Sequence, residues 1–130
     1  MKLSRPEEKI RQDLIQKLTR ELGFLQELIA VEKELSQLPH LSGKQLPKRR
    51  VDLVCYTKNI YPLLLVECKA IPLSDKALDQ VLGYNYYINA EFVAISNGQT
   101  QVISDKEGKR VWYEWIHYRE LVRESELSFL

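Results

Sequence analysis

The sequence feature that most constrains this chain is a pair of short apolar runs, residues 51–56 and 63–69, joined by the mainly polar connection 57–62. Apolar runs of this length, separated by a few turn-forming residues, are typical of a β-hairpin. Side chains alternate between the two faces of a strand, so Glu67 and Lys69 are expected to be neighbours on one face. We therefore expect the rest of the chain to be organised around this hairpin.

Three charged residues, Asp52, Glu67 and Lys69, lie in or beside these apolar runs. Removing a charge from water costs several kcal/mol unless the charge is paired or binds a metal, so something must compensate them. One interpretation is structural: Glu67 pairs with Lys69 at a sheet edge, and Asp52 starts a strand. The other is a metal site of two carboxylates, with the ammonium about 7 Å along the same strand face, given a rise of about 3.3 Å per residue. Such a site suits phosphodiester chemistry.

Length and composition predict one soluble domain, residues 1–130. The chain is long enough to bury a single core. Its 45% hydrophobic and 28% charged residues are ordinary for a globular protein. No apolar run approaches the roughly 20 residues needed to span a bilayer, and the N-terminus has no hydrophobic signal segment. We therefore expect a cytoplasmic protein without a membrane partner.

The two cysteines, Cys55 and Cys68, both fall inside apolar runs. This placement favours buried, reduced thiols over a disulfide framework. A zinc site would also need His40 and His117, but the four residues follow no recognised zinc spacing.

The formal net charge is +1, from 19 Lys and Arg against 18 Asp and Glu. Nucleic-acid binding would therefore require a local basic patch or a partner with more positive charge. The candidate patch is Lys44, Lys48, Arg49 and Arg50, directly before Asp52. These residues would bring positive charge beside the proposed site; the alternative is a solvated loop.

The N-terminal segment predicts a helix. Ser4 and Glu7 fit a capping box, with Pro6 in the first turn. Gly23 is well placed to end the helix. A carboxylate facing the sheet from this helix could serve a metal ion through water, and we favour Glu8 over Glu7 because the capping box already occupies Glu7. The apolar stripe of the helix is formed by Ile10, Leu14, Ile15, Leu18 and Leu22.

Residues 24–38 are ambiguous, because their composition favours a helix whereas residues 28–31 could open a strand. Propensity alone predicts a helix. A loop is expected at 39–47, and Ser74 is expected to cap a second helix at 75–88.

On this second helix, Gln80 and Tyr84 are four residues apart and therefore adjacent on one face. The residues expected to pack are Leu78, Val81, Leu82, Tyr86 and Tyr87.

Beyond the second helix, residues 91–96 and 100–104 predict a second hairpin. They flank Asn97-Gly98, a strong type I′ turn signal.

The C-terminal segment is expected to add a strand at 110–115 and a short amphipathic helix at 118–127. Leu121 and Leu127 are expected to face inward from this helix.

Together these motifs resemble the N-terminal nuclease domain of type I restriction enzyme R subunits. The core motif of the PD-(D/E)XK nuclease superfamily is matched by Asp52 and, after residues 53–66, by Glu67-Cys68-Lys69. Gln80 and Tyr84 resemble the QxxxY motif of its RecB-like branch. The resemblance covers about the first 100 residues of the sequence. Its further motifs are Pro6-Glu7-Glu8, Ile10-Arg11-Gln12, Leu22-Gly23-Phe24, Val31-Glu32-Lys33-Glu34-Leu35, Arg50-Val51-Asp52, Leu65-Val66-Glu67-Cys68-Lys69-Ala70, Asp79-Gln80, Tyr84-Asn85 and Val93-Ala94-Ile95-Ser96-Asn97-Gly98.

The resemblance implies an α/β fold of the PD-(D/E)XK restriction-endonuclease-like type. This fold is a mixed sheet flanked by helices, in the order α-β-β-β-α-β, here with C-terminal strands and a short helix. It also implies that residues 31–35 form the first strand, against their helical propensity, and we adopt that prediction.

The activity implied is hydrolysis of DNA phosphodiesters that depends on Mg²⁺ or Mn²⁺. Asp52 and Glu67 would hold the cation together with the backbone carbonyl of Cys68. Lys69 would orient the attacking water or stabilise charge on the phosphate. Glu8 would complete the outer shell of ligands.

Gln80 and Tyr84 would steady Lys69 or contact the DNA backbone; alternatively, they only satisfy one another. Lys48, Arg49 and Arg50 are the candidate DNA-binding residues. The expected partners are DNA and the motor or specificity subunits of a restriction system, and a homodimer is an alternative assembly. The competing hypothesis is a module that keeps the nuclease fold but binds DNA or other subunits without catalysis.

Overall fold

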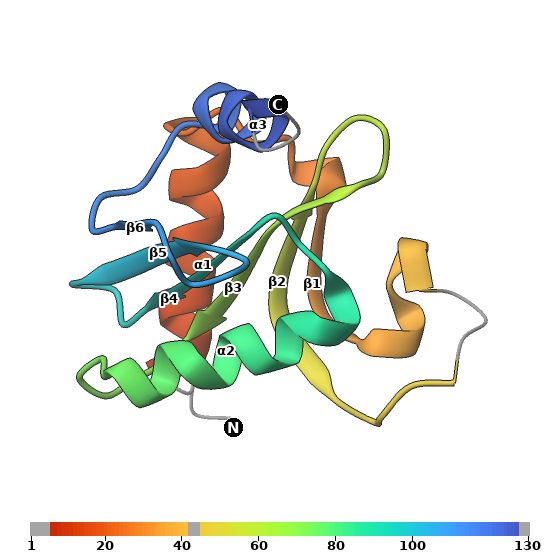
Figure 1. Cartoon of the computed structure of the whole chain (residues 1–130). Coiled ribbons are helices and arrows are strands. Elements are labelled where there is room, and N and C mark those ends of the chain that lie inside the picture. Colours follow the sequence, from red (N-terminus) through yellow and green to blue (C-terminus); the bar gives the residue numbers. More distant parts are fainter. Residues whose placement is uncertain (1–5, 42–44, 128–130) are drawn as a thin grey trace.

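The computed structural model describes residues 6–41 and 45–127. It shows one six-stranded sheet with helices on both faces (Figure 1). Two predicted features, the Ser4 cap and the Lys44 member of the basic patch, lie outside the described residues. In chain order the elements are α1 (Pro6–Arg20), η1 (Gln26–Leu28), β1 (Ile29–Glu34), η2 (Leu35–Gln37), η3 (Pro39–Leu41), β2 (Arg50–Tyr56), β3 (Pro62–Cys68), α2 (Asp75–Ile88), β4 (Phe92–Ser96), β5 (Gln101–Asp105), β6 (Val111–Trp112) and α3 (Tyr118–Leu127).

The strands lie side by side in the order β1-β2-β3-β4-β5-β6. Every neighbouring pair is antiparallel except β3 and β4, which run parallel and are connected through α2. A parallel pair needs such a long crossover, whereas antiparallel neighbours need only a turn. The expected mixed sheet and the element order α-β-β-β-α-β are confirmed.

The central hairpin forms where the sequence predicts it. β2 pairs with β3 from Leu53↔Val66 to Tyr56↔Pro62, and the connection closes with a hydrogen bond of 2.9 Å from Thr57 N to Tyr61 O. All seven residues of β3 are buried, as a central strand covered on both faces requires.

The first strand shows tertiary structure overriding local propensity. Residues 29–34, which composition alone assigns to a helix, form β1 against β2. The strand implied by the family resemblance is therefore right in kind, although it begins two residues earlier than the predicted residue 31. The pairing surface offered by β2 explains the outcome, because strand preference depends mainly on such neighbours.

The sheet separates two apolar layers. On one face, Leu14 and Leu18 of α1 and Leu121 of α3 pack against alternate residues of β2, β3 and β4. On the other face, Val81 and Ile88 of α2 pack against the remaining strand residues, together with η2 and η3. The two faces are visible in Figure 1, where α1 and α2 lie on opposite sides of the sheet.

Local signals place the helix ends. Ser74 Oγ accepts a hydrogen bond of 3.2 Å from Ala77 N, which confirms the predicted cap of α2. Gly23 follows α1 with a φ of +79°, the left-handed conformation common after helices. A Cβ at this glycine would lie 2.5 Å from His117 Cε1, so the close approach of the two segments also requires glycine.

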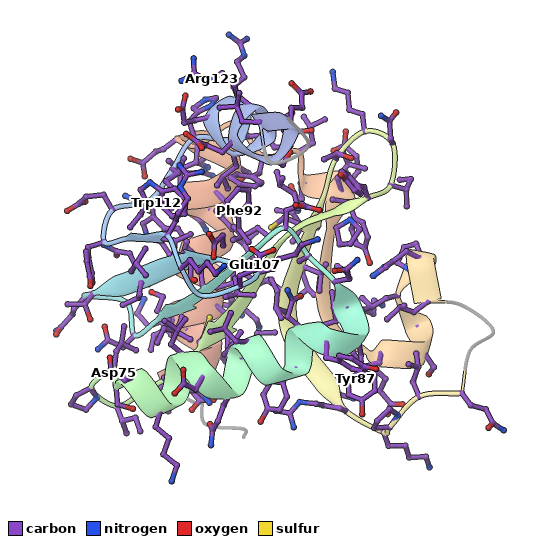
Figure 2. The ribbon with its side chains drawn as sticks, viewed as in Figure 1. Asp75, Tyr87, Phe92, Glu107, Trp112 and Arg123 are labelled. Carbon is purple, nitrogen blue, oxygen red and sulfur yellow. The ribbon has the colours of Figure 1, made fainter. Side chains whose placement is uncertain are left out.

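Three side chains that the sequence predicts to pack are exposed. Tyr86 and Tyr87 are 83% and 40% exposed rather than packed, because they lie on the side of α2 that faces away from the sheet; Figure 2 shows Tyr87 near one end of α2 and Asp75 near the other. Leu127 is 50% exposed at the end of α3, whereas Leu121 is buried.

The second hairpin turns on different residues from those expected. Asn97 N donates to Thr100 O over 3.2 Å, so Gly98 and Gln99 are the central residues. Gly98, in the first central position, has a φ of +90°, whereas Gln99 in the second is not among the described residues with a positive φ. A positive φ at the first central position alone is typical of a type II′ turn rather than type I′. Asn97 instead accepts hydrogen bonds through Oδ1 from the backbone N–H groups of Gln99 and Thr100.

The last strand is shorter than predicted. β6 contains only Val111 and Trp112, and Trp112 packs edge-on against Phe92 with 5.8 Å between ring centroids (Figure 2). None of the helices in the described ranges is long and apolar enough to cross a membrane.

Asn85 fixes the connection from α2 to β4. Its side chain donates to Ala90 O and accepts from Ala90 N, both over 2.8 Å, and the residue is only 4% exposed. The chain reverses between them at Asn89, which has a φ of +59°. The amide therefore replaces two backbone hydrogen bonds at a buried turn.

We expect Asn85→Ala to lower the free energy of unfolding by about 2 kcal/mol or more, because it leaves the buried N–H and C=O of Ala90 unpaired. Urea denaturation followed by circular dichroism would measure the change. The control is Asn59→Ala in the exposed β2–β3 loop, which should shift stability by less than about 0.5 kcal/mol. Equal effects from the two variants would contradict this account of the turn.

Candidate active site

Asp52 and Glu67 meet at the open end of the central hairpin. Main-chain pairing of β2 with β3 ends at Leu53↔Val66, and Asp52 and Glu67 occupy the next facing positions in the same register. Directly opposed side chains in an antiparallel pair share one face of the sheet. Beyond this point the Asp52 carboxylate continues the ladder, because Oδ2 accepts a hydrogen bond of 2.8 Å from Cys68 N.

Glu67 is a buried carboxyl group without a partner for one oxygen. The residue is 8% exposed, and Oε1 has no hydrogen bond within the described structure. Burial, and then the neighbouring Asp52 carboxylate, raise the pKa of Glu67 from 4.5 to about 8, while Lys69 acts in the opposite direction. At neutral pH this carboxyl therefore carries a proton in the absence of a cation.

Glu67 and Lys69 do not form the ion pair that the structural interpretation expects. In the part of the chain that the structure describes, Lys69 makes no ion pair with Glu67. The Lys69 backbone N–H donates to Ser96 O over 2.8 Å, which extends the parallel β3–β4 pairing by one residue. Its side chain is half-buried, so the ammonium lies at the edge of the site.

Arg11 is the residue that sequence reasoning missed. Its guanidinium lies 3.4 Å from Asp52 Oδ1 and 3.2 Å from Glu32 Oε2, and its side chain is only 8% exposed. A helical spacing signal was present, because Arg11 precedes Leu14 and Leu18 on the buried stripe of α1. A charged residue on such a stripe predicts a buried partner.

Within the described ranges, neither Gln80 nor Tyr84 forms a side-chain hydrogen bond with Lys69. The side chains of Gln80 and Tyr84 also form no hydrogen bond with each other. Instead, the Arg49 guanidinium lies over the Tyr84 ring, 3.1 Å from its centroid. Gln80 is exposed. On the face that Gln80 and Tyr84 share, Gln80 is therefore open to solvent, whereas Arg49 covers the Tyr84 ring.

The basic patch divides into two kinds of residue. Lys48 and Arg50 are exposed, whereas Arg49 is half-buried and its Nε is buried without a hydrogen-bond partner in the described structure. Arg50 belongs to β2, opposite Glu34 of β1. The patch thus lies at the same end of β2 as Asp52.

The role of Glu8 as an outer ligand that acts through water stays a prediction. Glu8 is half-buried on α1, but among the described residues no group of three His, Cys, Asp or Glu side chains is arranged to hold a metal ion. Glu7 is exposed, yet its charge is one of the causes that raise the pKa of Cys68. The charge of Glu7 therefore also acts on the end of β3.

Both cysteines are free and buried, as expected. Burial raises the pKa of each thiol to about 12, and at Cys68 the carboxylates of Asp52 and Glu67 contribute further. The thiols therefore stay neutral at physiological pH. His40 is engaged elsewhere, with Nδ1 2.8 Å from the Tyr56 hydroxyl and Nε2 2.7 Å from Ile88 O.

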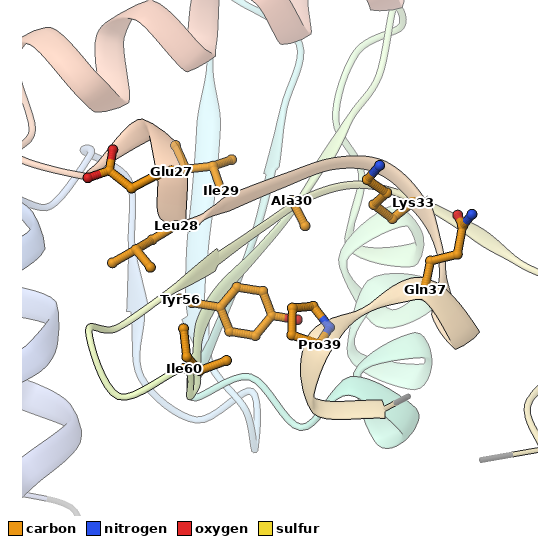
Figure 3. A pocket seen from close by; sticks show the side chains of 9 residues that line it. All are labelled: Glu27, Leu28, Ile29, Ala30, Lys33, Gln37, Pro39, Tyr56 and Ile60. Carbon is orange, nitrogen blue, oxygen red and sulfur yellow. The ribbon is translucent and has the colours of Figure 1, made fainter. Parts of the chain in front are cut away.

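An apolar pocket of about 210 Å³ lies at the β1 edge of the sheet, away from these carboxylates (Figure 3). Ala30, Pro39, Tyr56 and Ile60 are among its lining residues, and none of Asp52, Glu67 or Lys69 lines it. The pocket is therefore separate from the carboxylates at the hairpin end.

Comparisons with known proteins agree with the fold. A family model described as "Type I restriction enzyme R protein N terminus (HSDR_N)" matches residues 6–118. The chain belongs to this family. The resemblance inferred from the sequence motifs is thereby confirmed at the level of the family.

A solved structure is similar to this R-subunit N-terminal domain: a fragment described as an HsdR subunit of a type I restriction enzyme from Vibrio vulnificus YJ016. The TM-score is 0.67 at 18% sequence identity, covering 92% of this chain and 25% of that chain. The domain thus spans about a quarter of the length of that structure. At this identity the similarity shows the fold alone. No curated protein matches the domain significantly.

The raised pKa of Glu67 predicts an unusual pH dependence of stability. The folded carboxyl titrates near pH 8 and the unfolded one near 4.5, so between these values the folded state binds the additional proton. The free energy of unfolding should therefore fall as pH rises from about 5 to 8, by up to about 1.4 kcal/mol per pH unit.

We expect Glu67→Gln to remove this slope, because glutamine does not titrate, and urea midpoints measured across the pH range would show it. Glu27→Gln, at an exposed position, serves as the control and should retain the wild-type slope. A Glu67→Gln protein with the wild-type slope would mean that Glu67 is not the titrating group.

Proposed function

We propose that this domain hydrolyses DNA phosphodiesters with the help of a divalent cation, as a nuclease of the PD-(D/E)XK type. The observation that carries the proposal is the pair of facing carboxylates at the open hairpin end. Glu67 is almost fully buried there with one oxygen unpartnered. A buried oxygen without a hydrogen-bond donor is costly, and a bound cation at this position would compensate it.

The donor set fits Mg²⁺ or Mn²⁺. Carboxylate oxygens suit hard cations, and Mg²⁺ usually keeps several waters while it binds one or two protein carboxylates. Asp52 and Glu67 would be these ligands, joined by the backbone carbonyl of Cys68. Glu8 would then contact the cation only through a bound water. A bound cation would lower the pKa of its water and neutralise charge on the phosphate.

The side chains around the pair have separate roles in this proposal. The Cys68 N–H holds Asp52 Oδ2 at 2.8 Å, which keeps one carboxylate fixed. Lys69, two residues beyond Glu67 on the same strand face, would orient the attacking water or stabilise developing negative charge on the phosphate. Its partial exposure leaves the ammonium accessible to a substrate.

The basic patch is the proposed DNA contact. Lys48 and Arg50 are exposed near the start of β2 and would bind phosphates without reading sequence. Arg49 is already stacked on Tyr84, so this pair would border the DNA-binding surface. Gln80 is exposed on the same face of α2 and would contact the DNA backbone.

The family suggests the partners. We propose that the domain acts in a type I restriction system, with DNA as substrate and with motor or specificity subunits supplying further DNA contacts. A homodimer is the alternative source of those contacts.

One observation favours a second candidate, a non-catalytic DNA-binding or assembly module. Arg11 already neutralises Asp52 across 3.4 Å, so the pair could be wholly structural. The two candidates differ in whether cleavage and cation binding depend on the carboxylates.

The test is a nicking assay on supercoiled plasmid with Mg²⁺ or Mn²⁺, paired with calorimetric titration of Mn²⁺. We expect Asp52→Asn to lose cation binding, and Lys69→Ala to bind the cation but cleave at least about 100-fold more slowly. The control, Lys58→Ala in the exposed loop at the other end of the hairpin, should cleave as wild type. If the wild-type protein binds no cation at millimolar concentration, the non-catalytic candidate is favoured instead.

A further inference from the structure

Arg11 joins two carboxylates on neighbouring strands. Its guanidinium nitrogens lie 3.2 Å from Glu32 Oε2 and 3.4 Å from Asp52 Oδ1. The Arg11 side chain is 8% exposed, against 18% for Asp52 and 45% for Glu32. An arginine cannot lose its proton in a protein, so this buried charge needs at least one carboxylate at all times.

The backbone of β1 is distorted at the residue that supplies the second carboxylate. Val31↔Leu53 and Lys33↔Val51 are paired on either side, and Glu32 faces Asp52 between them. Glu32 has a φ of +50°, the left-handed region that residues other than glycine rarely enter within a strand. The register is the same on both sides, so the distortion is confined to Glu32. Such local strain is common at functional sites.

Three carboxylates therefore occupy consecutive facing positions across three strands: Glu32 on β1, Asp52 on β2 and Glu67 on β3. Arg11 lies between the first two. The proposed cation site lies between the second and the third. Asp52 is shared, so a guanidinium and a divalent cation compete for the same carboxylate.

We propose that Arg11 is a positioning residue that pairs with both Asp52 and Glu32 in the cation-free domain and transfers its pairing wholly to Glu32 when a divalent cation binds Asp52. This inference rests on the cation site of the proposed function. Repulsion between the two positive charges would weaken the contact of Arg11 with Asp52. Glu32, already 3.2 Å from Arg11, keeps the buried guanidinium paired after that change.

Arg11 and Glu32 have opposite effects on the affinity for the cation. Arg11 lowers the affinity for the cation, because it competes for Asp52. Glu32 raises the affinity, because it draws Arg11 away. Asp52 itself would stay in place without Arg11, since the Cys68 N–H still holds its other oxygen at 2.8 Å. A purely structural ion-pair network would instead change stability without this opposite effect on cation binding.

The experiment is a titration of the purified chain with Mn²⁺, with free Mn²⁺ followed by electron paramagnetic resonance at fixed pH and ionic strength. Relative to wild type, Arg11→Met should bind Mn²⁺ at least about tenfold more tightly, and Glu32→Gln about threefold or more weakly. The double variant should match Arg11→Met, because Glu32 acts through Arg11.

Asp13→Asn is the matched control for charge. Asp13 lies on α1 with a 66% exposed side chain, so its neutralisation should leave Mn²⁺ affinity unchanged. Thermal unfolding of each variant would show that it is folded. If Arg11→Met failed to fold, Glu32→Gln would decide the question, because an exposed residue tolerates this substitution better.

The outcomes separate the two proposals. If the wild-type protein binds Mn²⁺ and Glu67→Ala does not, the cation site stands. In that case, unchanged or weaker binding by Arg11→Met, or a Glu32→Gln effect that persists without Arg11, would overturn the transfer of pairing. If the wild-type protein binds no Mn²⁺ at millimolar concentration, the cation site and the inference built on it both fail.

Discussion

The hydrogen bond from the Cys68 N–H to the Asp52 carboxylate is the contact on which the candidate site depends. Backbone pairing of β2 with β3 stops one residue before Asp52, and its side chain takes over the next position in the ladder. Because Glu67 directly precedes Cys68 in the chain, the same bond fixes Asp52 relative to Glu67. The arrangement places the buried Glu67 beside a second carboxylate, and its burial together with the charge of Asp52 raises the pKa of Glu67.

Balancing charge at this end of the sheet requires elements that are distant in sequence. Helix α1 contributes Leu14 and Leu18 to one apolar layer, and its buried stripe also carries Arg11 into the site. On the opposite face, α2 brings Tyr84 under the Arg49 guanidinium. The two helices therefore pack the sheet and also supply the surroundings of the hairpin end, on both faces.

Much of the fold follows from local patterns. The two apolar runs predict β2 and β3, Ser74 predicts the start of α2, and the helical period predicts α1 and α3. β1 could not be predicted from propensity, because its residues favour a helix until β2 offers a pairing edge. Tyr86 and Tyr87 were expected to pack, but the orientation of α2 on the sheet leaves them exposed. Asn97-Gly98 predicts a hairpin correctly, while the register of β4 with β5 decides which residues are central in its turn.

The sequence by itself determined which residues the hairpin would bring to its open end. Strand alternation and the spacing of the apolar runs are local properties, so they place Asp52, Glu67 and Lys69 without knowledge of other elements. Only the tertiary structure decided what neutralises them. Arg11 and Asp52 are 41 positions apart, and they meet because α1 packs on the sheet with Arg11 on its buried stripe. The physical reason is that a buried charge is compensated by whichever group packing brings near it, and packing is not encoded locally.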